Sequence, residues 1–351
     1  QSRREGGKIF GSGSRTPVAV SILVKDGSDS HQLHYYDIGD YLSRKEKLNI
    51  ISKYGDISKI VWRDIIPDGN FDWLNQRDPN YQKYSSLVGD CGSVFISNSL
   101  GINTNRDIWV TGFNKNKLRD KVKILIENYN NEMKKVSALP SDERENSLTT
   151  NEGIVKWTSE LKRQALKGVR HIYRSQEVPY LYRPFTKKWL YYDKDFVHRA
   201  GKYYKKFGDR NLVITTSGRG STKDFSVLVC DTIPDMNSMS AGSQGFMRYD
   251  NEVDETSLFQ NNDNMNQAFA DKLGLNLDDT FAYVYGLLNS KEYQEKYAND
   301  LKKDLARIPI VKNKERYVEV GQKLMDLHLN YEEVPVYEGV EITPFVNPNY
   351  K

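Results

Sequence analysis

Positive charge and aromatic rings are concentrated together in residues 156–225 of the 351-residue chain. This stretch holds 17 Lys and Arg against 6 Asp and Glu, a net charge of +11, whereas the whole chain carries only +4. Lysine and arginine neutralise phosphates, and aromatic rings can stack on bases. The stretch is therefore typical of a nucleic-acid-binding surface. The same composition also fits a solvated charged face above an aromatic core, and this alternative stays open.

A polar turn supplies side chains of a second kind. Asn103, Thr104, Asn105 and Arg106 lie between two apolar segments of SVFISNSLGINTNRDIWVTGF, residues 93–113. Amide, hydroxyl and guanidinium groups can hydrogen-bond base edges or phosphates. Asparagine also serves the backbone geometry of turns, so the sequence pattern by itself leaves both interpretations open.

No complete catalytic or metal-binding set is readable in the sequence. Asp193 and Asp195 could imitate the carboxylate pair of a nuclease, but such sites usually add a further acid and a lysine, and this short pattern is common by chance. The five histidines show no metal-ligand spacing with cysteine or glutamate. No glycine-rich turn joins a strand to a helix as in nucleotide-binding folds. We expect a binding module without its own metal or cofactor.

Composition narrows the class of protein further. No apolar run approaches the ~18 residues of a membrane span. Cys91 and Cys230 are too few for a disulfide scaffold or a zinc module, and free thiols of a cytoplasmic protein are expected. The chain begins at Gln1 within SRREGGKIFGSGSR, which suggests a piece of a longer protein.

Short strands and helices alternate along the chain, which predicts an α+β fold. Residues 8–40 are predicted to form a β-hairpin from Pro17–Asp26 and Gln32–Gly39. Residues 250–279 are Asn- and Asp-rich and predict an exposed loop. Further strands are expected at 186–193, 210–218, 226–235 and 244–249, and helices at 116–136, 157–172, 280–309, with a break at Asn289-Ser290, and 318–331.

Several longer strings resemble a known family. SVFISNSLGINTNRDIWVTGFN, YLYRPFTKKWLYYD, DTIPD, YVYGLLNSKEYQEKYANDLKKDLARIPIV and LMDLHLNY resemble, in matching order, the C-terminal part of type ISP restriction–modification enzymes. These large bacterial single-chain proteins join a nuclease, a DNA-translocating ATPase, an adenine-N6 methyltransferase and a C-terminal target-recognition domain. The resemblance covers nearly the whole chain.

The resemblance implies a domain division. Residues 1–40 would be the C-terminal edge of the methyltransferase core, with the hairpin as a remnant of its α/β sheet, and 41–351 the target-recognition domain. We divide the latter into a first part (41–153), a basic β-rich DNA-binding part (154–250) and C-terminal helices (280–331). Phe10 matches the aromatic residue that stacks on the extruded adenine in related methyltransferases.

Two layers of DNA contact are then expected, one that reads bases and one that holds phosphates. Arginine and lysine suit guanine, and asparagine suits adenine. Arg183 could instead pair with an internal carboxylate, and the two roles remain equally open. The base-reading candidates are Asn103, Asn105, Arg106, Arg183, Arg219 and Lys223, and the phosphate candidates are Lys187, Lys188, Arg199, Lys202, Lys205 and Lys206.

The expected function is sequence-specific recognition of double-stranded DNA, which positions a target adenine for methylation and licenses translocation and cleavage by the parent protein. The methyl-donor loop and the Asn-Pro-Pro-Tyr-type catalytic motif of the family are absent. S-adenosylmethionine, ATP and Mg²⁺ are therefore implied for upstream domains of the same polypeptide. The alternative is an RNA-binding or protein-docking domain that uses the basic aromatic surface.

We predict that the purified chain neither methylates nor cuts DNA. The measurement is methyl transfer and strand cleavage with S-adenosylmethionine and Mg²⁺. Turnover that disappears in Asp193→Ala or Asp195→Ala would contradict this prediction and favour a nuclease.

Overall fold

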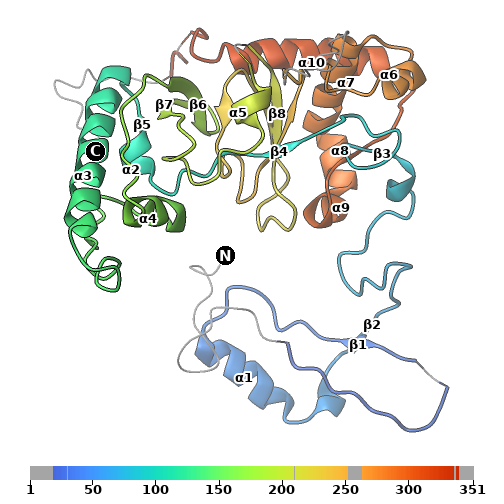
Figure 1. The fold of residues 1–351 in the computed structure, drawn as a ribbon. Coiled ribbons are helices and arrows are strands. Elements are labelled where there is room, and N and C mark those ends of the chain that lie inside the picture. Colours follow the sequence, from blue (N-terminus) through green and yellow to red (C-terminus); the bar gives the residue numbers. More distant parts are fainter. Residues whose placement is uncertain (1–18, 30, 209, 252–262, 336, 340–351) are drawn as a thin grey trace. The chain divides into compact units, whose positions relative to one another are not determined.

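The computed structural model describes residues 19–29, 31–208, 210–251, 263–335 and 337–339, which form parts of two compact units, Gln1–Arg77 and Asp78–Lys351 (Figure 1). The side chains of Tyr204 and Lys205 also lie outside this description. The division after Arg77 falls further along the chain than the boundary after residue 40 that the resemblance implied.

The first unit is built on α1 (Arg44–Tyr54) and a two-stranded ribbon, β1 (His34–Tyr35) with β2 (Arg63–Asp64). Ser43 caps α1: its hydroxyl accepts from the amide of Glu46, whose carboxylate accepts from the amide of Ser43. A single 3-10 turn (Ile57–Lys59) follows.

The predicted hairpin over residues 8–40 is not found in its described part. Residues 19–29 form no strand, and β1 pairs with β2 rather than with the segment before it. A strand is stabilised by a paired neighbour and by burial of one face. Val20, Leu23 and Val24 have neither and are strongly exposed, so apolar β-branched composition alone did not produce a strand here.

Two four-stranded sheets form the centre of the second unit. The first has the order β10 (Ile233–Pro234), β6 (Glu177–Arg183), β7 (Thr186–Tyr191), β5 (Thr111–Gly112), with β10 parallel to β6 and the other pairs antiparallel. The second is antiparallel, in the order β4 (Ser99–Leu100), β11 (Gln244–Met247), β8 (Val213–Thr216), β9 (Val227–Cys230). A further antiparallel pair joins β3 (Ser85–Ser86) to β12 (Arg307–Ile308). A single 3-10 turn, Tyr81–Lys83, precedes β3.

The second sheet is buried on both faces and separates two hydrophobic cores. Val213, Cys230 and Met247 are cross-strand neighbours that join the core with α3 (Lys115–Ser137) and α4 (Ser159–Leu166). Ile214, Val229 and Phe246 point to the opposite face, toward the helices of the C-terminal part. Because successive side chains of a strand alternate between faces, one apolar strand can serve both cores.

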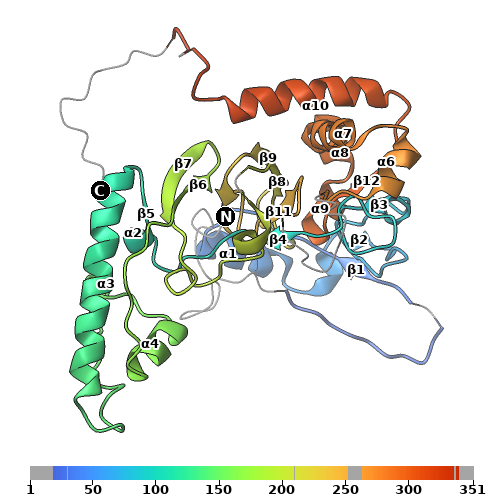
Figure 2. The ribbon, with the colours of Figure 1, turned by 45° about the horizontal axis from the view of Figure 1, so that its top comes forward.

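Helices cover both sides of the two sheets. Figures 1 and 2 show α3 and α4 (green) on one side and the C-terminal helices (orange to red) on the other. α3 packs on β5, β7 and α2 (Asp107–Val110), and the four-residue helix α5 (Tyr203–Lys206) lies near β8. The C-terminal helices are α6 (Gln267–Leu273), α7 (Leu277–Asn289), α8 (Lys291–Lys296), α9 (Ala298–Lys303) and α10 (Lys314–Leu329).

The long helices were predicted better than the short elements. The expected break at Asn289-Ser290 is confirmed, because the Ser290 hydroxyl accepts from the Tyr293 amide and starts α8. The expected helix 157–172 is shorter, since Gly168 at φ 73° ends the helical path. The loop predicted over 250–279 was wrong for 267–273, where Asn266 caps α6, and for 277–279, where α7 begins.

α10 crosses α7 at a contact that only glycine allows. A Cβ at Gly321 would lie 2.0 Å from the carbonyl oxygen of Ala282, and one at Gly286 would lie 2.3 Å from that of Tyr317. The two backbones therefore touch directly, and the core behind β9 depends on this close approach.

Gly321→Ala should destabilise the second unit by about 1–3 kcal/mol, because overpacking forces the two helices apart. Thermal unfolding of the chain measures this as a lower Tm. The matched control is Gly112→Ala in β5, where the new Cβ would meet its nearest atom at an ordinary 3.6 Å. Equal stability of the two variants would contradict the crossing argument.

Candidate nucleic-acid interface

Asp235 lies where three segments of the second unit meet. Its amide donates to the carbonyl of Leu181 in β6 at 2.9 Å, just after β10 ends. On the other side, Ile102 donates to the carbonyl of Pro234 at 2.9 Å and accepts from the Met236 amide at 2.8 Å. The segment that follows β4 is thereby fixed alongside the end of β10.

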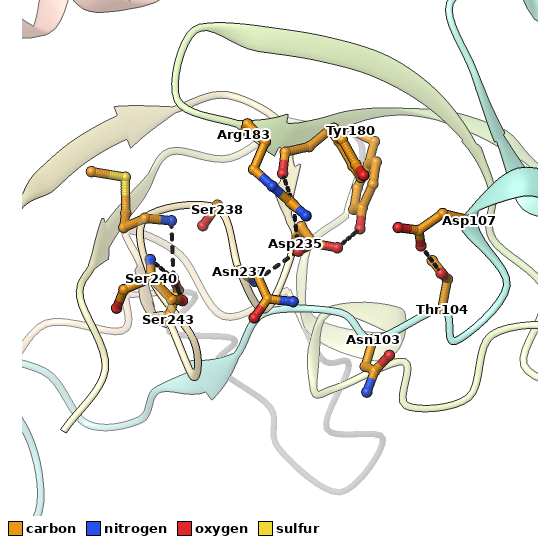
Figure 3. A network of polar contacts seen from close by, with 12 residues as sticks. Asn103, Thr104, Asp107, Tyr180, Arg183, Asp235, Asn237, Ser238, Ser240 and Ser243 are labelled. Atoms are coloured by element: carbon orange, nitrogen blue, oxygen red, sulfur yellow. Dashed lines mark hydrogen bonds and ion pairs between the residues drawn. The ribbon is translucent and has the colours of Figure 1, made fainter. Parts of the chain in front are cut away.

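The Asp235 side chain is buried, with 3% of the residue exposed, and is satisfied by three donors (Figure 3). The Tyr180 hydroxyl, Arg183 Nη1 (2.9 Å) and the Asn237 amide (2.7 Å) all donate to its carboxylate. Burial raises the pKa of Asp235, and these three groups offset part of that effect. Burial and the neighbouring carboxylate raise the pKa of Tyr180, so its hydroxyl stays a donor.

Arg183 therefore pairs with an internal carboxylate, which was one of the two roles expected for it. Its guanidinium pairs with Asp235 and lies 4.0 Å above the Tyr182 ring, and 39% of its side chain remains exposed. In Figure 3 it lies on the opposite side of Asp235 from Asn103. The structure thus places Arg183 apart from the polar turn with which it was expected to act.

The burial of Arg106 contradicts the prediction that this residue reads a base. The residue is 1% exposed, and its Nη atoms donate to the carbonyl of Phe196 (3.1 Å) and the hydroxyl of Thr158 (3.0 Å). Burial lowers its pKa to about 10. Arg106 joins the start of α2 to the cap of α4 and the 193–197 turn, which makes it a structural residue.

The amides of the predicted turn remain at the surface. Asn103 is half-buried, and its Oδ1 accepts from the amide of Asn105 at 3.0 Å. Asn105 is exposed and adopts φ 54°. Its left-handed backbone is one that asparagine tolerates better than most residues, so turn geometry accounts for an asparagine there.

A serine-rich loop, residues 236–243, was not singled out from the sequence. It lies directly beside the polar turn, since Gly101 donates to the carbonyl of Ser243 at 3.1 Å. A Cβ at Gly101 would lie 2.4 Å from the backbone of Asp235, so this approach requires glycine. The only sequence signal for the loop was its turn-forming composition, DMNSMSAGS after DTIPD.

The loop after β8 adds the basic residues Arg219 and Lys223. It touches the serine loop, because the Gly218 amide donates to the Ser240 hydroxyl at 3.1 Å. Arg219 is 60% exposed and lies 3.4 Å from Asp304, and Lys223 is exposed. Both predicted cations therefore lie in a loop whose Gly218 contacts the serine loop.

Arg199 and Lys202 adjoin the polar turn from its other side. Asn103 and Arg199 exchange two backbone hydrogen bonds, and the Lys202 amide donates to the Ser99 hydroxyl at 3.0 Å. Both side chains are exposed. Four segments thus adjoin one another in the order 199–202, 99–105, 236–243 and 218–224, and we call them the loop cluster.

The remaining phosphate candidates lie elsewhere or are engaged. Lys206 pairs with Asp250 at 2.5 Å, and Lys187 lies 3.6 Å from Asp231. Lys188 lies 3.6 Å above the Tyr182 ring, and burial lowers its pKa. The side chain of Lys205 and all of Phe10 lie outside the described residues.

Asp193 and Asp195 do not form a nuclease-like pair. Asp193 accepts from the amide of Asp195, and Asp195 accepts from Gln164 at 3.0 Å. Both carboxylates therefore stabilise local structure. Within the described ranges, no three His, Cys, Asp or Glu side chains are grouped so as to hold a metal ion. Among the same residues, no helix has the length and apolar character needed to cross a membrane.

Comparison with known proteins decides the family. The family model of the type ISP C-terminal specificity domain matches residues 93–351. The chain belongs to this family. The α+β fold expected from the resemblance agrees with solved structures of such enzymes. No curated protein is significantly similar to the chain.

Three solved structures resemble the chain closely. A nuclease-deletion mutant of the type ISP restriction–modification enzyme LlaGI, in complex with a DNA substrate mimic, has 43% identity over 97% of the chain and a TM-score of 0.81. The ATP-dependent type ISP enzyme LlaBIII bound to DNA has 31% identity over 90% (TM-score 0.76), and a DrdV–DNA complex has 27% over 87% (TM-score 0.76). The chain covers only 27%, 21% and 31% of those proteins, respectively.

Arg106→Ala should lower the unfolding free energy by about 2–4 kcal/mol, because it leaves a cavity and an unpaired carbonyl at Phe196. The folded fraction should keep whatever duplex preference the unmodified chain has. Calorimetry measures the first effect and competition binding the second. Lys223→Ala, an exposed cation of the loop cluster, is the stability control. An unchanged Tm together with a lost base preference would restore Arg106 as a base reader.

Proposed function

We propose that this chain recognises a specific sequence in double-stranded DNA as the specificity domain of a type ISP restriction–modification enzyme. The observation that carries the proposal is the loop cluster, in which amides at the surface lie between two groups of exposed cations. Amides suit base edges, and exposed cations suit phosphates. All three similar structures are complexes with DNA or a DNA substrate mimic, which supports the same conclusion for this chain.

Three cations of the loop cluster are suited to phosphates because folding leaves their charges without an acidic partner among the described residues. In the described part of the chain, the side chains of Arg199, Lys202 and Lys223 make no ion pair. Lys206 and Lys187, in contrast, already face carboxylates. We therefore narrow the phosphate layer to Arg199 and Lys202 on one flank and Lys223 on the other. Arg219 already lies 3.4 Å from Asp304 and stays a base-reading candidate.

The aromatic residues of the basic stretch favour duplex recognition over stacking on single strands. Three lysine ammonium groups lie over these rings. Lys115 Nζ is 4.6 Å from the centre of the Trp189 ring, and Lys123 Nζ is 5.4 Å from that of Tyr173. Lys188 lies over the Tyr182 ring. A single-strand platform offers free ring faces to successive bases. These faces are instead engaged by the chain's own cations, which weakens the RNA-binding alternative.

Recognition by this chain would serve chemistry performed by the rest of a longer polypeptide. We propose that it positions a target adenine for N6 methylation and licenses translocation and cleavage. S-adenosylmethionine, ATP and Mg²⁺ are assigned to upstream domains, as the family resemblance implies. Phe10 stays a proposed stacking partner of the extruded adenine.

Selection of bound duplexes from a random library tests the proposal. The chain should enrich one short sequence, and its affinity for that duplex should fall steeply with salt. Tighter binding of single strands or RNA than of any duplex would refute it.

Lys202→Ala should weaken binding to all duplexes alike and lower the salt slope by about 1, because one phosphate contact is lost. Lys206→Ala should change the slope less, since Lys206 faces Asp250. Lys272→Ala, an exposed lysine of α6 outside the loop cluster, should leave it unchanged. Equal effects of all three variants would contradict the assignment.

A further inference from the structure

The serine loop is internally rigid, which suits it to more than connecting two strands. The buried Ser243 hydroxyl accepts from the amides of Met239 (3.0 Å) and Ser240 (3.1 Å) and donates to the Ser240 carbonyl (2.7 Å). Its amide donates to the Met236 carbonyl at 2.8 Å, which closes the loop. Ser238 contacts the Thr215 hydroxyl of β8 at 3.3 Å. The serines therefore face inward and fix the loop backbone.

Asn237 is the polar side chain that this rigid loop turns outward. Its amide donates to the Asp235 carboxylate at 2.7 Å, and the next amide, of Ser238, donates to the Asp235 carbonyl at 2.9 Å. The backbone on both sides of Asn237 is thus held by one buried residue. The Asn237 side chain is exposed and makes no hydrogen bond within the described part of the chain.

Backbone geometry does not explain an asparagine at position 237. The non-glycine residues with positive φ in the described ranges include Asn105 but not Asn237. Asn237 also caps no helix, since α6 and the other described helices begin elsewhere. Neither a left-handed backbone nor a helix cap accounts for this asparagine, and with the described residues its side chain makes none of the local hydrogen bonds by which asparagine stabilises a turn. Its free donor and acceptor are therefore available for a ligand.

Asn237 and Asn103 lie beside the same buried residue. Ile102 and Asp235 form a parallel β-bridge (Figure 3). Asn103 directly follows Ile102, and Asn237 follows Asp235 by two residues. The Asn103 amide nitrogen is also without a partner among the described residues, whereas its oxygen accepts from Asn105. Two surface amides are thus presented from adjoining, hydrogen-bonded segments.

We propose that Asn237 reads an adenine in the major groove of the recognised duplex, with Asp235 as the positioning residue that fixes its backbone; this rests on the proposed function. An amide donates to one position and accepts from another on the exposed edge of adenine, N7 and N6. A fixed backbone is what such a two-point contact needs, because its geometry tolerates little displacement. Exposed cations on the flanks would hold the phosphates while Asn237 enters the groove.

The test compares bound-duplex selection by the chain with that by Asn237→Ala and Asn237→Asp. Asn237→Ala should lose about 5- to 150-fold of discrimination at one adenine position and keep its preferences elsewhere. Asn237→Asp should change the preferred base there toward cytosine, whose amino group a carboxylate accepts. Both variants should unfold at the temperature of the parent chain, because the side chain makes no internal hydrogen bond.

Asn116→Ala is the matched control, since Asn116 is an exposed asparagine in the first turn of α3, outside the loop cluster. It should leave the selected sequence unchanged. If Asn237→Ala selects the same sequence with the same discrimination as the parent chain, the inference is wrong while the proposed function stands. If the parent chain itself selects no duplex, the proposed function fails first.

Discussion

The carboxylate of Asp235 has to be satisfied after burial, and much of the candidate interface is arranged by that requirement. A buried carboxylate without donors is costly, so the groups around it must hold their positions. Those groups come from β6 (Tyr180, Arg183) and from the start of the serine loop (the Asn237 amide). The Asp235 backbone meanwhile bonds to β6 and to the segment after β4. One residue therefore ties the serine loop to both sheets, which restrains the groups around it.

The two-faced sheet supplies the rigidity behind this arrangement. β8, β9 and β11 are buried on both faces, and two segments of the loop cluster adjoin these strands: 218–224 lies between β8 and β9, and 236–243 leads into β11. A loop that begins or ends at a strand packed on both faces has a fixed end point. Gly101 and Gly218 then bring the loops within backbone contact of one another, at points where a Cβ would lie 2.4–2.5 Å from backbone atoms.

How much of this could be predicted from the sequence depended on element length. Leu118, Val122 and Ile126 recur at helical spacing and are buried in α3, because a long amphipathic helix leaves a periodic pattern. β4, β5 and β10 have two residues each and leave none, since pairing partners distant in sequence create them. Arg106 shows a similar limit for the prediction of site residues, because the sequence of a polar turn does not indicate whether its arginine points inward or outward. Asn237 was missed because the sequence does not show which polar residues of a serine-rich loop face inward. In the structure the serines are buried and Asn237 is exposed.

The charge of residues 156–225 divides into two populations once the chain is folded, and this division fits different physical tasks. Lys187, Lys188 and Lys206 are held by carboxylates or rings, so they contribute to the fold and are less available to a ligand. Arg199, Lys202 and Lys223 are exposed and make no ion pair within the described part of the chain, so their side chains are less restrained. A phosphate contact tolerates that freedom because it depends on charge more than on angle, whereas a base edge demands fixed geometry. Ordering a side chain on binding costs free energy and weakens affinity. A residue that contacts a base therefore gains more from a fixed backbone than a residue that contacts a phosphate. The internally hydrogen-bonded serine loop between flanking exposed cations is the arrangement that this difference favours.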